Sequence, residues 1–238
     1  MKKLGIIGGL GPMATAYFLQ LIVEMTDALT DQEHIEVLLH SRPQIPDRTK
    51  FILGVSRDSP VPYLVETGVT LAEQGAELIA IPCITAHFFQ NQLEEKIGCP
   101  MIHTIEETAD YLRSEHIHHV GIMATDGTIK SELFQQVFAG YDIACTVPQT
   151  EEQGQIMHII YDNVKAGLPI EMDLFEEVSR KLFAQGAEVL LLGCTELSLI
   201  KGNYKLGKGY LDVMEVLARR AVLSCGKLKS EYQHLITR

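Results

Sequence analysis

One stretch of this chain occurs twice, and this repeat limits the possible folds more than any other feature. The segment "EQGAELIAIPC" covers residues 73–83, and "AQGAEVLLLGC" covers residues 184–194, so the second copy follows 111 residues later and aligns without a gap. A unit of this length is much longer than a solenoid repeat and has the size of a small α/β domain. The repeat therefore predicts two homologous domains.

Apolar runs that end in glycine or polar turns alternate with segments of helical periodicity in both halves of the chain. Alternation of this kind predicts parallel sheets covered by helices. The expected strands are residues 2–9, 35–41, 76–83, 118–124, 143–148 and 187–194. The expected helices are residues 13–29, 63–75, 131–140 and 175–186, with a further helix that begins near Thr85. The segments 100–112 and 208–220 are each predicted to form a strand followed by a helix.

The predicted fold class is α/β, with two pseudo-symmetric domains, each a mostly parallel sheet flanked by helices. We expect residues 1–98 and 208–238 to form the first domain, and residues 99–207 to form the second. No long Pro- or Ser-rich linker separates the halves, so the two domains should lie close together. An active site is expected in the cleft between them.

Composition excludes several classes of protein. The 20 basic and 31 acidic residues give a net charge of −11 without a basic cluster, which argues against nucleic acid as a partner. The apolar runs are too short for a membrane span, and the N-terminal segment lacks a signal-peptide cleavage pattern, so we expect a cytoplasmic protein without membrane partners. The five cysteines are odd in number and widely spaced, which favours free thiols over a disulfide framework.

Four polar turns follow strands, at residues 8–15, 82–87, 124–128 and 193–197. In parallel sheets the ligand site lies at the carboxyl ends of the strands, so facing domains would bring Cys83 and Cys194 to opposite sides of one cleft. Two facing thiols suit racemisation, because one thiolate can remove the α-proton while the other thiol returns a proton to the opposite face. Both cysteines are expected at a helix N-terminus, a position that lowers the pKa of a thiol.

The cysteines and the glycine-rich turn also have other interpretations. Free cysteine often acts as a small buried hydrophobe, and we interpret Cys99, Cys145 and Cys225 in this way. A disulfide between Cys83 and Cys194, or a metal shared with His87 or His103, has no spacing signature in its favour. The glycines in "IIGGLGPMAT" do not follow the GxGxxG spacing, so this turn is interpreted as an anion site and not as a nucleotide site.

Six motifs together resemble the aspartate/glutamate racemase family, and most closely its aspartate racemase branch. In chain order they are "GGLGPMAT", "PQIPDRT", "PCITAH", "ATDGT", "NVKAG" and "GCTEL". The resemblance covers nearly the whole chain. It implies racemisation of aspartate, with glutamate or a broader range of substrates also open, without a cofactor or metal, and it implies a homodimer.

The resemblance also implies roles for single residues, with Cys83 and Cys194 as the catalytic pair. The implied substrate-binding residues are Gly9, Met13, Arg48, Thr85, Thr125, Thr128, Lys165, Thr195 and Glu196. The threonine turns would hold the α-carboxylate, and Arg48 and Lys165 would hold the side-chain carboxylate, since a guanidinium binds a carboxylate with two hydrogen bonds.

One residue departs from the family pattern, and it leaves alternatives open. The first cysteine motif often has Asn after the cysteine, whereas here Ile84 stands there. Hydantoin racemases and maleate isomerases share the implied fold, and the latter use a thiol as a nucleophile. A non-catalytic small-molecule binding protein and a thiol redox protein are the rivals from other functional classes.

Overall fold

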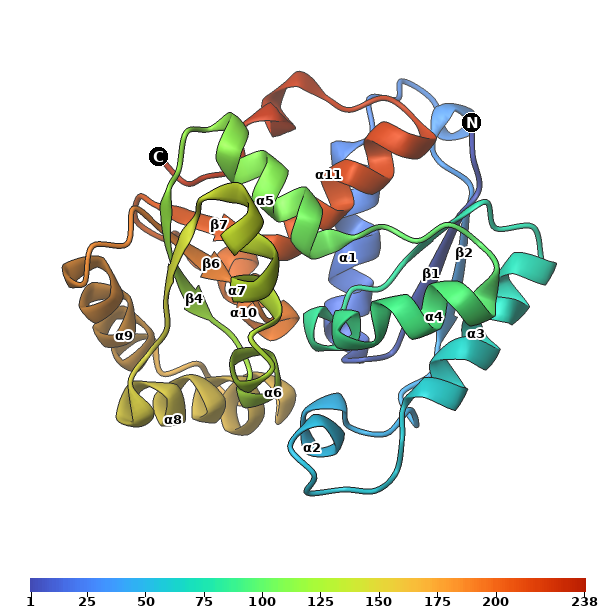
Figure 1. Ribbon diagram of the computed structural model, residues 1–238. Helices are drawn as coiled ribbons and strands as arrows, with labels where there is room; N and C mark the ends of the chain where they lie inside the picture. Colours follow the sequence, from blue (N-terminus) through green and yellow to red (C-terminus); the bar gives the residue numbers. More distant parts are fainter.

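The computed structural model describes residues 1–238 and contains two parallel sheets, each covered by helices (Figure 1). The strands are β1 Leu4–Gly8, β2 Val37–Ser41, β3 Leu78–Ala80, β4 His119–Met123, β5 Ala144–Thr146, β6 Val189–Leu192 and β7 Tyr210–Asp212. The first sheet has the order β2-β1-β3, and the second has the order β5-β4-β6-β7. The predicted α/β class with two helix-covered sheets is therefore confirmed.

Helices make up most of the remaining chain. The α-helices are α1 Pro12–Met25, α2 Arg48–Ile52, α3 Val61–Glu73, α4 Gln90–Ile97, α5 Thr104–Ser114, α6 Asp126–Lys130, α7 Leu133–Phe138, α8 Thr150–His158, α9 Met172–Ala184, α10 Thr195–Asn203 and α11 Val213–Cys225. The short 3-10 helices are η1 Asp31–Glu33, η2 Ile84–Phe89, η3 Ala139–Tyr141 and η5 Ser230–Gln233, and η4 Ile159–Lys165 is a π-helix. No helix is both long enough and apolar enough to cross a membrane.

The two sheets share one topology, which gives the sequence repeat a structural meaning. In the first sheet β1 pairs with β2 and β3, and in the second β4 pairs with β5 and β6, always in parallel. Met101 adds a parallel bridge to Ile79 of β3, in the place that β7 takes beside β6. Each cysteine of the repeat thus follows the third strand of its own sheet.

The strand pairing differs from the predicted boundaries at both crossings of the chain. Met101 pairs in the first sheet although residues 99–207 were expected in the second domain, and β7 pairs in the second sheet although residues 208–238 were expected in the first. The helices that follow these segments do change sides, because α5 packs on α7 while α11 packs on α1 (Figure 1). The chain therefore crosses after each fourth strand, because main-chain pairing holds that strand in its own sheet. The remaining domain boundaries stay a prediction.

One apolar core spans both halves, and this fixes where the halves can separate. The largest cluster of buried apolar side chains joins Phe18 of α1, Ile122 of β4 and Leu217 of α11. Two smaller clusters lie on the outer faces, beneath α3 and α4 in one half and beneath α9 in the other. In Figure 1, α5 and α11 lie at the top of the molecule, whereas α2 and α6, which contact each other from opposite halves, lie towards the bottom.

Candidate active site

The two cysteines of the repeat line one cavity from opposite halves of the molecule. Cys83 is the N-cap of η2, Cys194 is the N-cap of α10, and both have extended backbone angles. Their side chains are buried, with 5% and 6% of each residue exposed. All five cysteines carry free thiols, and Cys99 and Cys225 are buried away from this cavity, while Cys145 is half-buried. The repeat thus places two equivalent thiols around a common space.

Threonine hydroxyls from both halves meet beside this cavity. Thr125 Oγ1 lies 3.2 Å from Thr49 Oγ1 and 3.1 Å from Thr85 Oγ1. Thr128 Oγ1 lies 3.1 Å from Thr85 Oγ1, and all four threonines are buried. Thr49 and Thr85 come from the half with the first sheet, whereas Thr125 and Thr128 come from the other half. We call these four residues the threonine cluster, which forms a bridge of hydroxyl groups between the halves.

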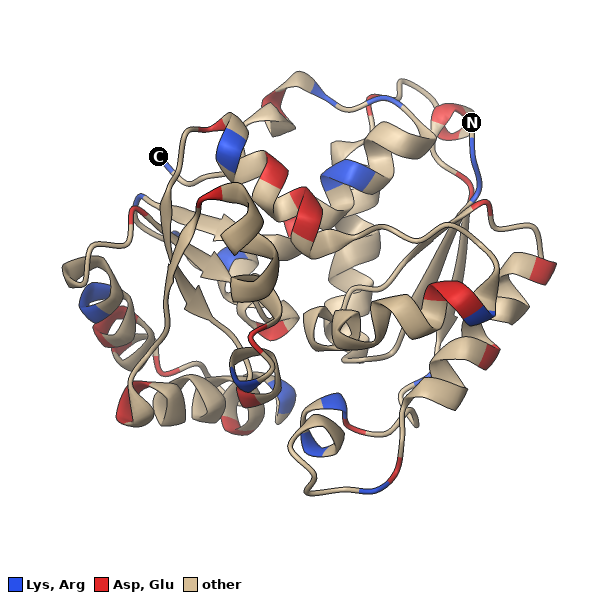
Figure 2. Cartoon of the chain, viewed as in Figure 1, with Lys and Arg blue, Asp and Glu red and all other residues tan.

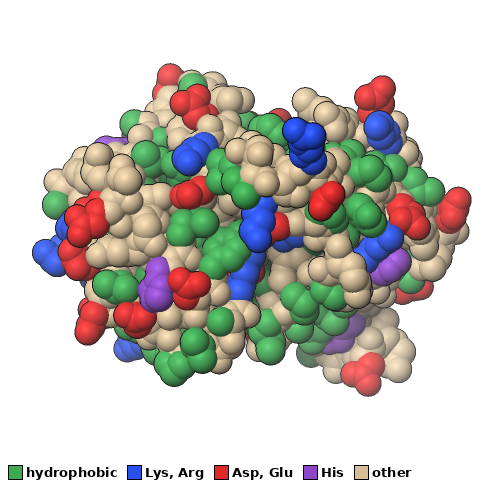
Figure 3. Space-filling view, turned by 90° about the horizontal axis from the view of Figure 1, so that it is seen from below, with side chains coloured by type: hydrophobic (Ala, Val, Ile, Leu, Met, Phe, Trp, Pro, Cys, Tyr) green, Lys and Arg blue, Asp and Glu red, His purple; other side chains and the backbone are tan.

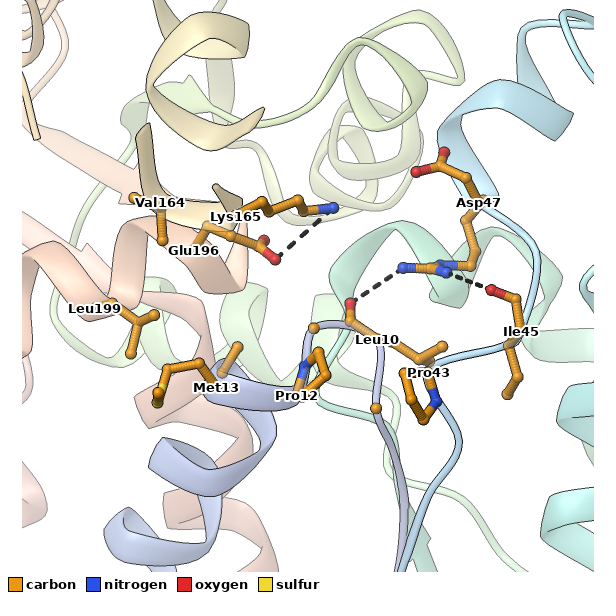
Figure 4. A pocket seen from close by; sticks show the side chains of 14 residues that line it. Leu10, Pro12, Met13, Pro43, Ile45, Asp47, Val164, Lys165, Glu196 and Leu199 are labelled. Carbon is orange, nitrogen blue, oxygen red and sulfur yellow. Dashed lines mark hydrogen bonds and ion pairs between the residues drawn. The ribbon is translucent and has the colours of Figure 1, made fainter. Parts of the chain in front are cut away.

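Arg48 lies within the first half and is 8% exposed. Its guanidinium donates hydrogen bonds to the carbonyl oxygens of Leu10 at 3.1 Å, Ile45 at 3.3 Å and Pro46 at 3.1 Å, and Figure 4 marks the first two with dashed lines. Burial by itself lowers the pKa of Arg48, but the neighbouring Cys83 raises it overall, so the guanidinium stays charged. The cation is therefore placed beside the first cysteine and held by backbone oxygens.

Lys165 faces this site from the other half, at the end of η4. Its Nζ lies 3.8 Å from Glu196 Oε1 and 4.3 Å from the centre of the Tyr161 ring. Burial by itself lowers the pKa of Lys165, but the Glu196 carboxylate raises it overall. In Figure 2 the basic segments of α2 lie near the basic segments beside α6, and Figure 4 shows the Lys165–Glu196 pair across the pocket from Asp47.

The thiol of Cys194 is held in its neutral form. Its Sγ donates a hydrogen bond to Glu196 Oε2 at 2.9 Å, and Thr195 Oγ1 donates to the same oxygen at 3.3 Å. Burial, together with the negative charge of Glu196, raises the pKa of Cys194 well above its ordinary value, and Lys165 offsets only part of this. The expectation that the helix N-terminus lowers the thiol pKa is therefore wrong for Cys194.

The cavity between the cysteines is small and continues into a larger pocket. Its volume of about 10 Å³ holds roughly one water molecule. Leu10, Arg48, Lys165 and Glu196 line both this inner cavity and an outer pocket of about 400 Å³. Gly9 and Met13, which were expected to bind substrate, line only the outer pocket, and Met13 is 69% exposed. The structure therefore separates the expected site residues into an inner and an outer group, apart from Thr128, which lines neither space and contacts Thr85 in the threonine cluster.

Sequence reasoning missed three polar residues that line the inner cavity, namely Asp47, Thr49 and Tyr161. Asp47 caps α2 by accepting a hydrogen bond from the backbone of Lys50, and it also accepts one from the Tyr161 hydroxyl at 3.2 Å. Asp47 and Thr49 flank Arg48 in the quoted motif "PDRT", so the motif contained a usable signal. Tyr161 precedes "NVKAG" and belongs to no motif.

His87 forms its hydrogen bonds with groups other than Cys83 and Cys194. Its Nε2 lies 3.1 Å from the Ile81 carbonyl oxygen and 3.0 Å from Thr104 Oγ1, while Nδ1 lies 2.8 Å from Gln90 Oε1. Burial lowers the pKa of His87, so the ring is neutral at pH 7. No group of three or more His, Cys, Asp or Glu side chains is placed to hold a metal ion.

Comparison with known proteins fits this arrangement. A model of the Asp/Glu/hydantoin racemase family matches residues 7–221. This chain belongs to the Asp/Glu/hydantoin racemase family. The structure of Picrophilus torridus aspartate racemase is 30% identical, covers 98% of both chains and has a TM-score of 0.86. The broad specificity amino-acid racemase RacX of Bacillus subtilis is 23% identical over 92% of this chain and 96% of its own length.

More distant members of the family share the fold. Glutamate racemase from Francisella tularensis is 17% identical, covers 94% of this chain and 80% of its own, and has a TM-score of 0.66. At this identity the likeness concerns the fold alone. Membership of the family supports a racemase, and hence an isomerase, as the class of enzyme.

Proposed function

We propose that this chain is a cofactor-independent racemase that interconverts L- and D-aspartate with Cys83 and Cys194 as the two bases. The observation that carries the proposal is that both buried cysteines line one cavity and reach it from opposite halves of the molecule. The catalytic pair, the implied binding roles, the cytoplasmic location and the homodimer remain predictions.

The reaction needs a base on one face of the α-carbon and an acid on the other. One cysteine, as thiolate, takes the α-proton and leaves a planar carbanion whose charge spreads onto the α-carboxylate. The other cysteine, as thiol, gives its proton to the opposite face and becomes the thiolate. The proton count is unchanged, and the roles reverse for the opposite enantiomer. In the substrate-free protein Cys194, which donates a hydrogen bond to Glu196, is the protonated thiol, and it therefore acts as the acid for one of the two enantiomers.

The threonine cluster is the group best suited to the α-carboxylate. Its hydroxyls can donate to carboxylate oxygens, and this donation grows stronger as charge develops during proton removal. Arg48 and Lys165 are the cations that reach the inner cavity, and they would hold the side-chain carboxylate of aspartate. The Lys165 ammonium would then bind both the Glu196 carboxylate and the substrate carboxylate.

Substrate entry requires movement, because the inner cavity holds roughly one water molecule. Besides the threonine cluster, the halves come close at two glycines: a Cβ on Gly11 would lie 2.9 Å from Glu196 Oε1, and one on Gly127 would lie 2.9 Å from Thr49 Cα. We expect these contacts to part when substrate binds and to close again around it, which would exclude water from the reacting thiols.

Deuterium uptake at the α-carbon in heavy water tests this function. The racemase should exchange the α-proton of both L- and D-aspartate, and a Cys83→Ala/Cys194→Ala double variant should exchange neither. The variant Cys99→Ala is the matched control, since the Cys99 thiol bonds to the Ala76 carbonyl oxygen and lies outside the cavity. A binding protein would leave both enantiomers unlabelled, and this result would refute the proposal.

A further inference from the structure

The outer pocket is larger and less polar than an aspartate side chain requires. It shares Leu10, Asp47, Arg48, Lys165 and Glu196 with the inner cavity, and we call these five residues the neck. Beyond the neck, the lining contains no charged side chain. Its residues are Gly9, Gly11, Pro12, Met13, Ala14, Pro43, Ile45, Val164 and Leu199 (Figure 4).

Each charged side chain at the neck has partners, although the buried Nε of Arg48 donates to none. Arg48 donates to three backbone carbonyl oxygens, and Asp47 accepts from the Lys50 backbone and from Tyr161. Lys165 pairs with Glu196, so the neck holds two cations and two carboxylates and has no net charge. Figure 3, which views the molecule from below, shows basic and acidic side chains close together at the middle of this face, with hydrophobic side chains beside them.

These two observations select the kind of side chain that the outer pocket can hold. The outer pocket has a volume of about 400 Å³, which lies within the range of small-molecule sites. The side chain of aspartate, a methylene group and a carboxylate, would leave most of this space empty. A carboxylate that passed the neck would leave both cations behind and would meet no charged partner in this lining. An uncharged side chain would instead bury its apolar surface against Met13, Val164 and Leu199.

We propose that the outer pocket is a side-chain subsite for long, unbranched, uncharged amino acids of the size of methionine. The α-carbon lies between the two thiols, and the side chain extends past Arg48 and Lys165 into the pocket. This subsite rests on the proposed racemase function and extends its substrates beyond aspartate. Leu199 is its specificity-determining residue, because α10 carries both this side chain and Glu196 of the neck.

The test compares L-methionine with L-aspartate in the same heavy-water assay. The wild-type chain should label both amino acids. The variant Leu199→Trp fills the pocket and should lower the ratio of kcat/KM for methionine to that for aspartate by about tenfold or more. Val23→Trp is the control for added bulk, since Val23 is 48% exposed on α1 and lines none of the pockets described.

The outcomes separate the subsite from the underlying function. If neither amino acid is labelled, the racemase proposal itself fails. If aspartate is labelled and methionine is not, only the subsite is refuted. An equal loss for both substrates in Leu199→Trp would identify the pocket as an entrance and would also refute the subsite. If that variant does not fold, Val164→Trp probes the same space from η4 and should lower the same ratio.

Discussion

The turn at Cys83 and the turn at Cys194 occupy equivalent places in the two sheets, yet they offer their thiols different surroundings. Two residues after Cys83 stands Thr85, whose hydroxyl joins the threonine cluster. Two residues after Cys194 stands Glu196, whose carboxylate accepts a hydrogen bond from the Cys194 thiol. The cation beside each cysteine also has different partners. Arg48, beside Cys83, binds carbonyl oxygens, whereas Lys165, on the side of Cys194, binds the Glu196 carboxylate.

This difference shows that a duplicated framework fixes the positions of two groups without making them chemically equal. Backbone topology sets the place of each cysteine. Cys83 follows β3, which pairs with β1, and Cys194 follows β6, which pairs with β4. The neighbouring side chains differ, since Glu196 helps to keep the buried Cys194 thiol protonated, whereas Thr85, at the equivalent position after Cys83, carries no carboxylate. A two-base mechanism needs this asymmetry in the resting enzyme, where one group must be an acid and the other a base.

The largest expected effect follows removal of either thiol. Cys83→Ala and Cys194→Ala should each lower racemisation of aspartate about 10³-fold, the scale of a lost general acid or base. Each variant keeps one base, so each should still exchange the α-proton of one enantiomer, and the two variants should differ in which one. Polarimetry and proton NMR in heavy water measure these effects. Full racemase activity in Cys194→Ala would contradict the two-base mechanism.

The asymmetry itself is tested by the substitution Glu196→Gln, for which a smaller effect is expected. Glu196 raises the pKa of Cys194, so the neutral amide should let this thiol ionise at lower pH. Alkylation of Cys194 by iodoacetamide, followed by peptide mass spectrometry from pH 6 to 10, should show a midpoint shifted downward and a rate at pH 8 raised about tenfold. Glu36→Gln, which removes a carboxylate paired with Lys3, is the control. An unchanged or raised midpoint would show that Glu196 does not control this thiol.

Much of the fold could be predicted because buried parallel strands have an unambiguous pattern. The runs that end at Cys83 and Cys194 are apolar throughout, and the helices between them have clear periodicity. The short helix α2 and the π-helix η4 could not be predicted, since each consists of a few residues whose conformation depends on contacts with the opposite half. The chain crosses between the halves after Met101 and after β7, and both crossings depend on long-range strand pairing that no local sequence pattern indicates.

The site could be predicted at the level of residue types but not of their pairing. The motifs named both cysteines and both cations, and the structure brings all four to the inner cavity. The hydrogen bond between the Cys194 thiol and Glu196 depends on side-chain geometry within the first turn of α10. Sequence periodicity does not predict such a contact. The contact between Tyr161 and Asp47 joins residues 114 positions apart, so only the folded chain reveals it.

The smallest expected effects compare the two halves through a matched pair of glycines. A Cβ on Gly5 of β1 would lie 2.7 Å from Ile79 Cδ1 and 2.8 Å from Ala76 Cβ. A Cβ on Gly121 of β4 would lie 2.5 Å from Leu190 Cδ2 and more than 3 Å from its other neighbours. Overpacking costs about 1–3 kcal/mol, so both Gly5→Ala and Gly121→Ala should lower the free energy of unfolding.

The two costs should not be equal. The tip of Leu190 can rotate away from the new methyl group, whereas Ala76 Cβ is fixed to the backbone, so Gly5→Ala should be the more damaging. Urea unfolding followed by circular dichroism measures both, with Gly140→Ala as the control, since a Cβ there meets no atom within 4 Å. A larger loss of unfolding free energy for Gly121→Ala than for Gly5→Ala would contradict this ranking.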